Sequence, residues 1–187
     1  DALNRSPEKY KAAVLGRRAE VFNYAPAQTK AKLLNAVKNG MLLYIDTQDF
    51  RFFDLSWLPG NISAQNTWES HYRPSPMSHR LFSGLPELLA NHHLVAAKLK
   101  ADDPWQILGE PGAVAIRKYG KGYIIINQLQ LFERPIGWLV PDHLRQMQRY
   151  FQNIISYSQK ADTTLPVMVV DQGQGTVIDI LSSINEW

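Results

Sequence analysis

Acidic side chains are the residues of this sequence that most resemble a catalytic set. A glycosidase needs two carboxyl groups held roughly 5 to 9.5 Å apart. Asp46 and Asp49 follow a continuous apolar run, and α/β sheets bind ligands at the edge where such strands end. We therefore predict a ligand-binding edge at these two residues, with hydrolysis or transfer of a saccharide through Asp or Glu as the alternative. That alternative could also use Asp54, Glu69 or Glu133.

A glycine-containing segment near the end of the chain, Asp171 to Thr176, is a second candidate site. Glycines let backbone amides turn toward an anion at a helix N-terminus, so Gly173, Gly175 and Thr176 could bind phosphate or a nucleotide. The segment lacks the full spacing of a dinucleotide-binding or P-loop motif. Two interpretations stay open: a strand-to-helix turn capped by Thr176, or the site of a small-anion sensor.

Aromatic residues in loop-like stretches are candidates for sugar stacking. Trp57 and Trp138 are the best placed, because a flat apolar ring complements the C–H face of a pyranose. Core packing or contact with another domain is the alternative role. The segment 47–60 is either a hydrophobic lid or an exposed contact surface. We predict a partly apolar contact surface formed by the aromatic residues Phe50, Phe52, Phe53, Trp57 and Trp138.

Composition excludes several classes of function. The 187 residues contain no cysteine, which removes disulfides and thiolate nucleophiles. The five histidines lack metal-ligand spacing, so we expect no metal and no cofactor. A net charge of +3 from scattered basic residues does not indicate nucleic-acid binding. No apolar run approaches the roughly 20 residues of a transmembrane helix, and the first residues do not form a signal peptide, so the chain is either cytosolic or already processed.

Periodic patterns place these residues on an α/β framework. Short apolar runs predict strands at 11–15 and 41–45, and the spacing of apolar residues predicts a helix over 27–37. The turns at 110–112 and 119–122 predict consecutive antiparallel strands, followed by a buried strand at 124–126. A helix begins at Pro141 with an apolar face, and a short strand is expected at 68–73. This order predicts a mainly parallel sheet with an antiparallel extension.

Three segments resemble class I glutamine-amidotransferase-like domains, which have a flavodoxin-like fold. The segments are AVKNGMLLYIDTQD, HRLFSGLPE and AVAIRKYGKGYIIINQLQL. The last two resemble elements of such domains where they are accessories of glycoside hydrolases of the β-galactosidase or family 2 type. The match covers roughly residues 10 to 158. It implies a flavodoxin-like three-layer sandwich.

The resemblance also implies a function. The amidotransferases use a cysteine nucleophile with a His-Glu pair, and this chain has no cysteine, so we expect no glutaminase activity. The implied role is a noncatalytic accessory or scaffolding domain of a larger carbohydrate-active or cell-envelope protein. Its partners would be neighbouring domains and, through the loop aromatics, a saccharide. This setting favours a periplasmic or extracellular location over the cytoplasm.

The ending, residues 164–187, reads as the strand, turn and helix with which domains of this type begin. Either it supplies a rearranged first strand and helix to a single domain of residues 1–187, or it starts a second domain. We predict that Val167 to Val170 adds a parallel strand to the sheet of Met41 to Ile45, with the helix from Thr176 covering one face. An undocked ending would expose apolar side chains and leave a sheet edge unpaired.

Overall fold

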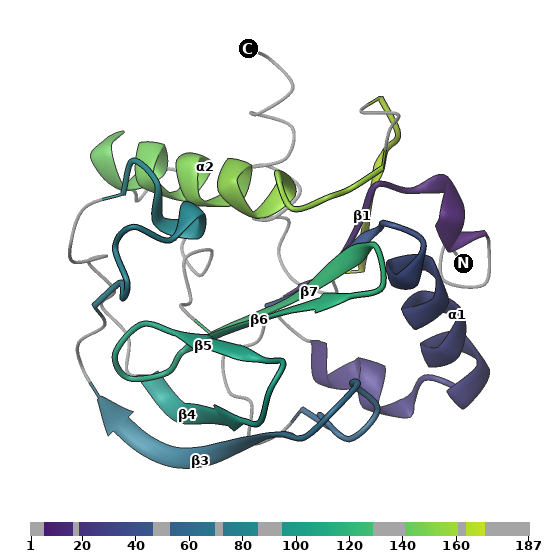
Figure 1. Cartoon of the computed structure of the whole chain (residues 1–187), viewed down its shortest axis with the longest axis horizontal. Helices are drawn as coiled ribbons and strands as arrows, with labels where there is room; N and C mark the ends of the chain where they lie inside the picture. Colours follow the sequence, from purple (N-terminus) through teal and green to yellow (C-terminus); the bar gives the residue numbers. More distant parts are fainter. Residues whose placement is uncertain are drawn as a thin grey trace.

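The structure is a computed structural model, and it describes residues 6–16, 19–46, 53–69, 73–85, 95–128, 141–160 and 164–170. Its helices are α1 (Ala27–Lys38) and α2 (Pro141–Ile155), with short 3-10 turns η1 (Pro7–Lys9), η2 (Ala19–Tyr24) and η3 (Arg80–Phe82). The strands are β1 (Ala12–Leu15), β2 (Leu42–Asp46), β3 (Ile62–Glu69), β4 (Val95–Ala101), β5 (Gln106–Leu108), β6 (Val114–Tyr119), β7 (Gly122–Asn127) and β8 (Val167–Val170). Figure 1 shows their arrangement.

Six strands form one mixed sheet in the order β5-β6-β7-β2-β1-β8. The neighbours β7, β2, β1 and β8 are all parallel, whereas β5, β6 and β7 pair antiparallel. The sheet is therefore mainly parallel with an antiparallel extension, as the sequence predicts. The continuous apolar runs of β1 and β2 are buried at every position, because these strands are covered on both faces.

The two helices pack on opposite faces of this sheet. Apolar residues of α2, including Met147 and Phe151, share one buried cluster with Val14, Leu42 and Ile125. Residues of α1 belong to a second buried cluster, which contains the alternate positions of the same strands. Alternate residues of a strand point to opposite faces, so one apolar run supplies both clusters. Figure 1 shows α1 and α2 on separate sides of the sheet.

The helix α1 begins after Pro26 and ends before Gly40, as its sequence predicts. Gly40 has a φ of 105°, which favours glycine, and it lets the chain turn directly into β2. The hairpin turn between β6 and β7 packs against this helix end. A Cβ on Gly122 would collide with the carbonyl oxygens of Val37 and Met41, so the close approach requires glycine.

The amino edge of the parallel strands is joined by the chain that follows α2. The Ser158 hydroxyl donates to the carbonyl of Lys11 at 2.7 Å, and the Gln159 amide donates to the carbonyl of Gly40 at 2.9 Å. Lys11 and Gly40 lie close before β1 and β2. The end of α2 therefore lies at the amino edge, opposite the edge where Asp46 ends β2.

The predicted strand at Val167 to Val170 is present. It pairs in parallel with β1 over four residues, from Ala12 with Val167 to Leu15 with Val170, in the sheet that contains β2. Met168 is 2% exposed and belongs to the core cluster on the α1 side. The predicted helix from Thr176 lies outside the described residues.

A second, two-stranded sheet is formed by β3 and β4 and is seen below β5 in Figure 1. The short strand expected at 68–73 overlaps the structure at residues 68–69, because β3 spans Ile62–Glu69; residues 70–72 lie outside the described residues, and Arg73 forms an isolated bridge with Glu110. A register shift between Asn66 and Glu69 interrupts the regular pairing. Such a bulge breaks the two-residue period on which strand prediction depends.

Candidate functional site

The candidate site lies at the carboxyl edge of the parallel strands. β1, β2 and β7 are parallel neighbours and end at Leu15, Asp46 and Asn127. The helix α1 connects β1 to β2, so it must run from the carboxyl edge back to the amino edge. Its first turn, together with η2 before it, therefore lies near the edge where Asp46 ends its strand.

Asp46 is part of a buried polar network at this edge. The Tyr44 hydroxyl donates to Asp46 Oδ2 at 2.8 Å, and Asn127 Nδ2 lies 3.5 Å from the same oxygen. The Tyr150 hydroxyl, from α2, donates to Asn127 Oδ1 at 3.2 Å. Two adjacent strands and one helix thus meet through four polar side chains.

The network is enclosed by the core. Asp46 is 6% exposed, and Tyr44 and Asn127 are fully buried. Burial raises the pKa of the Tyr44 phenol well above its usual value, and the nearby Asp46 carboxyl raises it further. The phenol therefore stays protonated and remains a donor to Asp46. Hydrogen bonds of this kind offset the cost of burying polar groups.

Trp57, the second predicted site residue that the structure describes, packs against two other aromatic rings. Its ring centroid is 5.2 Å from that of Phe22 and 6.4 Å from that of Phe53, and its ring is half-buried. Its indole N–H is buried and has no hydrogen-bond partner among the described residues. Phe53 is only 4% exposed, so its prediction as a contact-surface residue is wrong. Its ring fills the core beneath Trp57.

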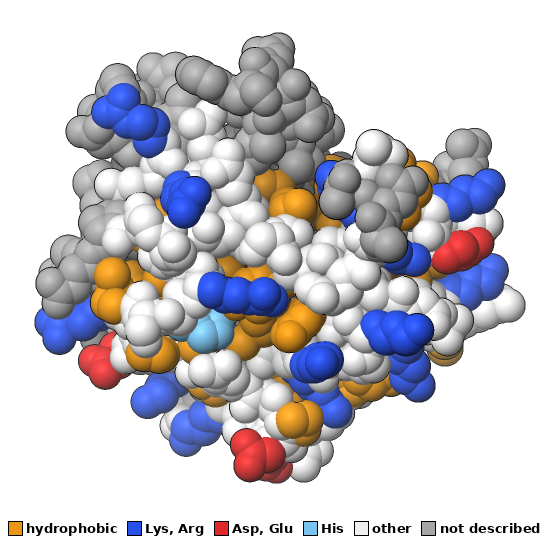
Figure 2. Space-filling model, turned by 45° about the horizontal axis from the view of Figure 1, so that its top comes forward, with side chains coloured by type: hydrophobic (Ala, Val, Ile, Leu, Met, Phe, Trp, Pro, Cys, Tyr) orange, Lys and Arg blue, Asp and Glu red, His pale blue; other side chains and the backbone are white. Residues whose placement is uncertain are grey.

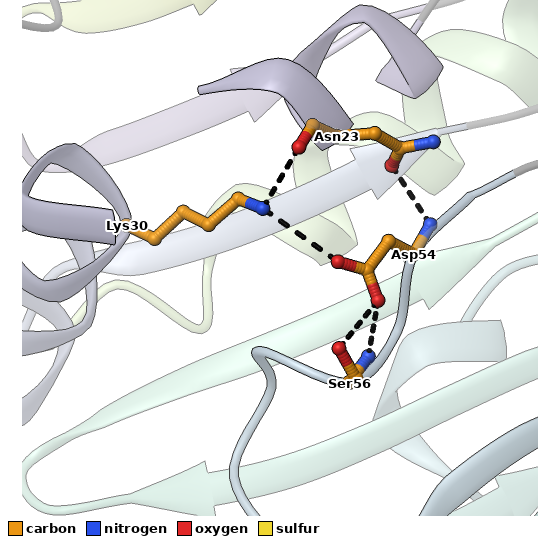
Figure 3. Close-up of polar contacts among 4 residues, drawn as sticks. All are labelled: Asn23, Lys30, Asp54 and Ser56. Atoms are coloured by element: carbon orange, nitrogen blue, oxygen red, sulfur yellow. Dashed lines mark hydrogen bonds and ion pairs between the residues drawn. The ribbon is translucent and has the colours of Figure 1, made fainter. Parts of the chain in front are cut away.

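A group of polar contacts holds the segment that carries Trp57. We call it the clasp; Figure 3 shows its members Asn23, Lys30, Asp54 and Ser56. Lys30 Nζ donates to the Asn23 carbonyl at 3.1 Å and lies 3.6 Å from Asp54 Oδ2. Asn23 Oδ1 accepts from the Asp54 amide at 2.7 Å, and Asp54 Oδ1 accepts from both the amide and the hydroxyl of Ser56.

The clasp ties the segment 53–60 to η2 and to the first turn of α1. The bonds from Ser56 lower the pKa of Asp54, and the charge of Lys30 lowers it further. The far end of the segment is held separately, because the Pro59 carbonyl accepts from Trp105 Nε1 at 2.9 Å and from Arg117. For residues 53–60 the lid interpretation is therefore correct, with Trp57 left half-exposed.

The other predicted site residues are not brought into this arrangement. Asp49, Trp138, Gly173, Gly175 and Thr176 lie outside the described residues, as do Phe50 and Phe52. Asp46 and Trp57 belong to different groups of contacts: Asp46 contacts Tyr44 and Asn127, whereas Trp57 packs on Phe22.

Sequence reasoning missed several residues of both groups. Tyr44 precedes Asp46 by two positions on a strand, so the two side chains share a face, and this spacing is a usable signal. Asn127 and Lys30 carry no such signal, since the carboxyl groups that they contact, on Asp46 and Asp54, are 81 and 24 positions away. Tyr24, which follows Asn23 of the clasp, is 90% exposed and was also missed.

In the part of the chain that the structure describes, no three histidine or acidic side chains gather as a group that could hold a metal ion. Among the same residues, no helix has the length and apolar character needed to span a bilayer.

Comparisons with known proteins assign no function. The chain matches no protein-family model and no curated protein. The solved structure of cytoplasmic protein STM3548 from Salmonella typhimurium aligns with a TM-score of 0.50 and 10% identity, over 81% of this chain and 73% of that protein. Cytoplasmic protein STM1381 from Salmonella typhimurium LT2 aligns with a TM-score of 0.49 and 12% identity, over 79% and 72% of the two chains. The first likeness is one of fold alone, and we draw no argument from the second.

Proposed function

We propose that this chain is a noncatalytic accessory domain of a larger carbohydrate-active or cell-envelope protein, with a flavodoxin-like, amidotransferase-like architecture. The observation that carries the proposal is the partly buried Trp57, which packs on Phe22 and Phe53 beside the clasp and keeps part of its surface exposed. A flat aromatic ring flanked by amide, carboxyl and ammonium groups has the composition of a saccharide-contacting surface. The same ring also suits contact with a neighbouring domain.

The environment of Asp46 supports a noncatalytic role. A general acid or base must come within hydrogen-bond reach of the proton that it transfers. The Asp46 carboxyl is 6% exposed and is bonded to a tyrosine hydroxyl of its own strand. With no cysteine in the sequence, the amidotransferase nucleophile is also missing.

Enzyme assays test the noncatalytic part of the proposal. We expect no hydrolysis of nitrophenyl glycosides and no ammonia release from glutamine above background. Glycoside hydrolysis that disappears in Asp46→Asn, while the variant remains folded, would instead support the saccharide hydrolase alternative.

A glycan microarray tests the saccharide contact. We expect binding that weakens in Trp57→Leu, which keeps apolar volume but removes the flat ring. Met77→Ala is the control, because Met77 is an exposed apolar residue of a different connection. Equal binding by Trp57→Leu and the wild type would refute the assignment of Trp57, and an array without any binding would refute saccharide recognition.

A further inference from the structure

A second group of side chains lies at the opposite, amino edge of the sheet. Arg80 of η3 places its guanidinium carbon 3.5 Å from the ring centroid of Tyr157 and 5.4 Å from that of Tyr123. Tyr157 follows α2 just before Ser158 and Gln159, which bond to the chain preceding β1 and β2. Tyr123 is the second residue of β7. This group therefore belongs to a different end of the molecule from Trp57 and Asp46.

The guanidinium of Arg80 is held in place and still accessible. It lies against the Tyr157 ring, while Arg80 as a residue is exposed. Arg80 forms no ion pair with a carboxyl group of the described residues. Stacking fixes the plane of a guanidinium, and a fixed fork of N–H donors matches the geometry of a carboxylate or phosphate.

Neighbouring groups add donors and positive charge. His79 Nδ1 accepts from the Leu81 amide at 3.4 Å, so in the neutral ring the proton lies on Nε2, which is then a donor. Lys118 pairs with Tyr123 across β6 and β7, which places the exposed Lys118 side chain on the same face as Tyr123. On the face in Figure 2, basic side chains lie across an apolar patch with a histidine beside it.

Tyr157 is the buried residue on which the Arg80 guanidinium lies. Its residue is 2% exposed, and its buried hydroxyl has no hydrogen-bond partner among the described residues. Burial raises the pKa of this phenol, and Arg80 opposes the change by stabilising the ionised form. Because the Tyr157 hydroxyl has almost no accessible surface, an anion bound by Arg80 contacts the exposed guanidinium and not the phenol.

We propose that Arg80, with His79, Lys118 and Tyr157 around it, forms a binding site for a carboxylate or phosphate oxyanion. The Arg80 fork binds two oxygens of the anion, and the Tyr123 ring forms an apolar wall beside it. The site is independent of the proposed function, because it shares no residue with the Trp57 surface. With a single stacked guanidinium as its main ligand, its affinity for a small anion is on the order of millimolar.

The test follows the Arg80 Nε–H resonance by NMR while sodium acetate or sodium phosphate is added to the whole chain. Arg80→Gln assigns the resonance, and sodium chloride at equal ionic strength is the control for screening. We expect a saturable shift with acetate, phosphate or both, together with a shift of the His79 ring signals. The acetate and phosphate arms distinguish a carboxylate ligand from a phosphate ligand.

Two variants separate a binding role from a packing role. Arg80→Lys keeps the charge but loses the fork of N–H donors, so we expect the anion to bind severalfold more weakly. Lys98→Gln, which removes an exposed charge on β4, should bind like the wild type. Three results would each overturn the proposal. The first is a response to chloride equal to the response to acetate and phosphate, and the second is no saturable shift with either anion. The third is an anion-induced shift of the His79 signals that is as large in Arg80→Gln as in the wild type. Melting curves establish that each variant is folded.

Discussion

Replacing Tyr44 by phenylalanine isolates the main hydrogen bond of the Asp46 network. The ring that packs against Phe151, with centroids 6.1 Å apart, is kept, and the hydroxyl that donates to Asp46 at 2.8 Å is lost. A hydrogen bond to a charged group contributes about 1.5 to 3 kcal/mol, so we expect a destabilisation of this size. For a chain of this length, each kcal/mol lowers Tm by about 2 to 4 °C. The expected fall in Tm is therefore about 3 to 12 °C.

Tyr157→Phe is the matched control for this measurement. Both tyrosines are buried, but the Tyr157 hydroxyl has no partner among the described residues. Its removal should leave the free energy of unfolding unchanged or slightly increased. Urea unfolding followed by circular dichroism, with thermal melts beside it, gives both values. The reasoning is refuted if Tyr44→Phe is as stable as the wild type, or if Tyr157→Phe is the more destabilised variant.

Three further predictions concern the fold and the clasp. Gly122→Ala should destabilise by about 1 to 3 kcal/mol or more, because its Cβ would collide with the backbone of Val37 and Met41, whereas Lys121→Ala on the same turn should be near neutral in urea unfolding. Asp54→Asn should cost less than about 1 kcal/mol at pH 7, because solvent screens the pair with Lys30; since folding lowers the pKa of Asp54 below 3.8, the difference between variant and wild type should persist above that pH and shrink below it. Deleting residues 164–187 should lower Tm or solubility, because it exposes the edge of β1 and removes buried Met168, worth about 1.5 to 3 kcal/mol; a truncated chain as stable as the whole would contradict this.

Local patterns were sufficient to predict much of the framework. The predicted strands and helix are present where apolar runs mark β1, β2 and β8 and where a periodic apolar face marks α2. These patterns are reliable because the spacing of apolar residues along an element follows from which of its faces are buried. The position of Asp46 followed from the same reasoning, since the residue after an apolar parallel strand must lie at the carboxyl edge. The first part of β3, Ile62 to Asn66, was not predicted, because it pairs regularly with β4 but carries mostly small and polar residues.

Contacts between distant positions could not be predicted. Asp46 and Asn127 meet only because β2 and β7 are neighbours in register, which the order of strands along the chain does not reveal. Phe53 and Trp57 belong to one aromatic segment, and composition alone cannot tell which ring enters the core and which stays half-exposed. Arg80 was overlooked because its partner Tyr157 is 77 positions away.

The most direct test of the proposed function is the indole N–H resonance of Trp57 during titration with saccharides. Trp57→Phe assigns the resonance among those of the five tryptophans. Cellotetraose, xylotetraose, chitotetraose and galactobiose serve as probes, each with a parallel assay for hydrolysis. We predict a saturable shift of the Trp57 signal with at least one saccharide and no hydrolysis of any. A Trp57 signal that moves with none of them, or hydrolysis that depends on Asp46, would contradict the account of a noncatalytic saccharide-contacting domain.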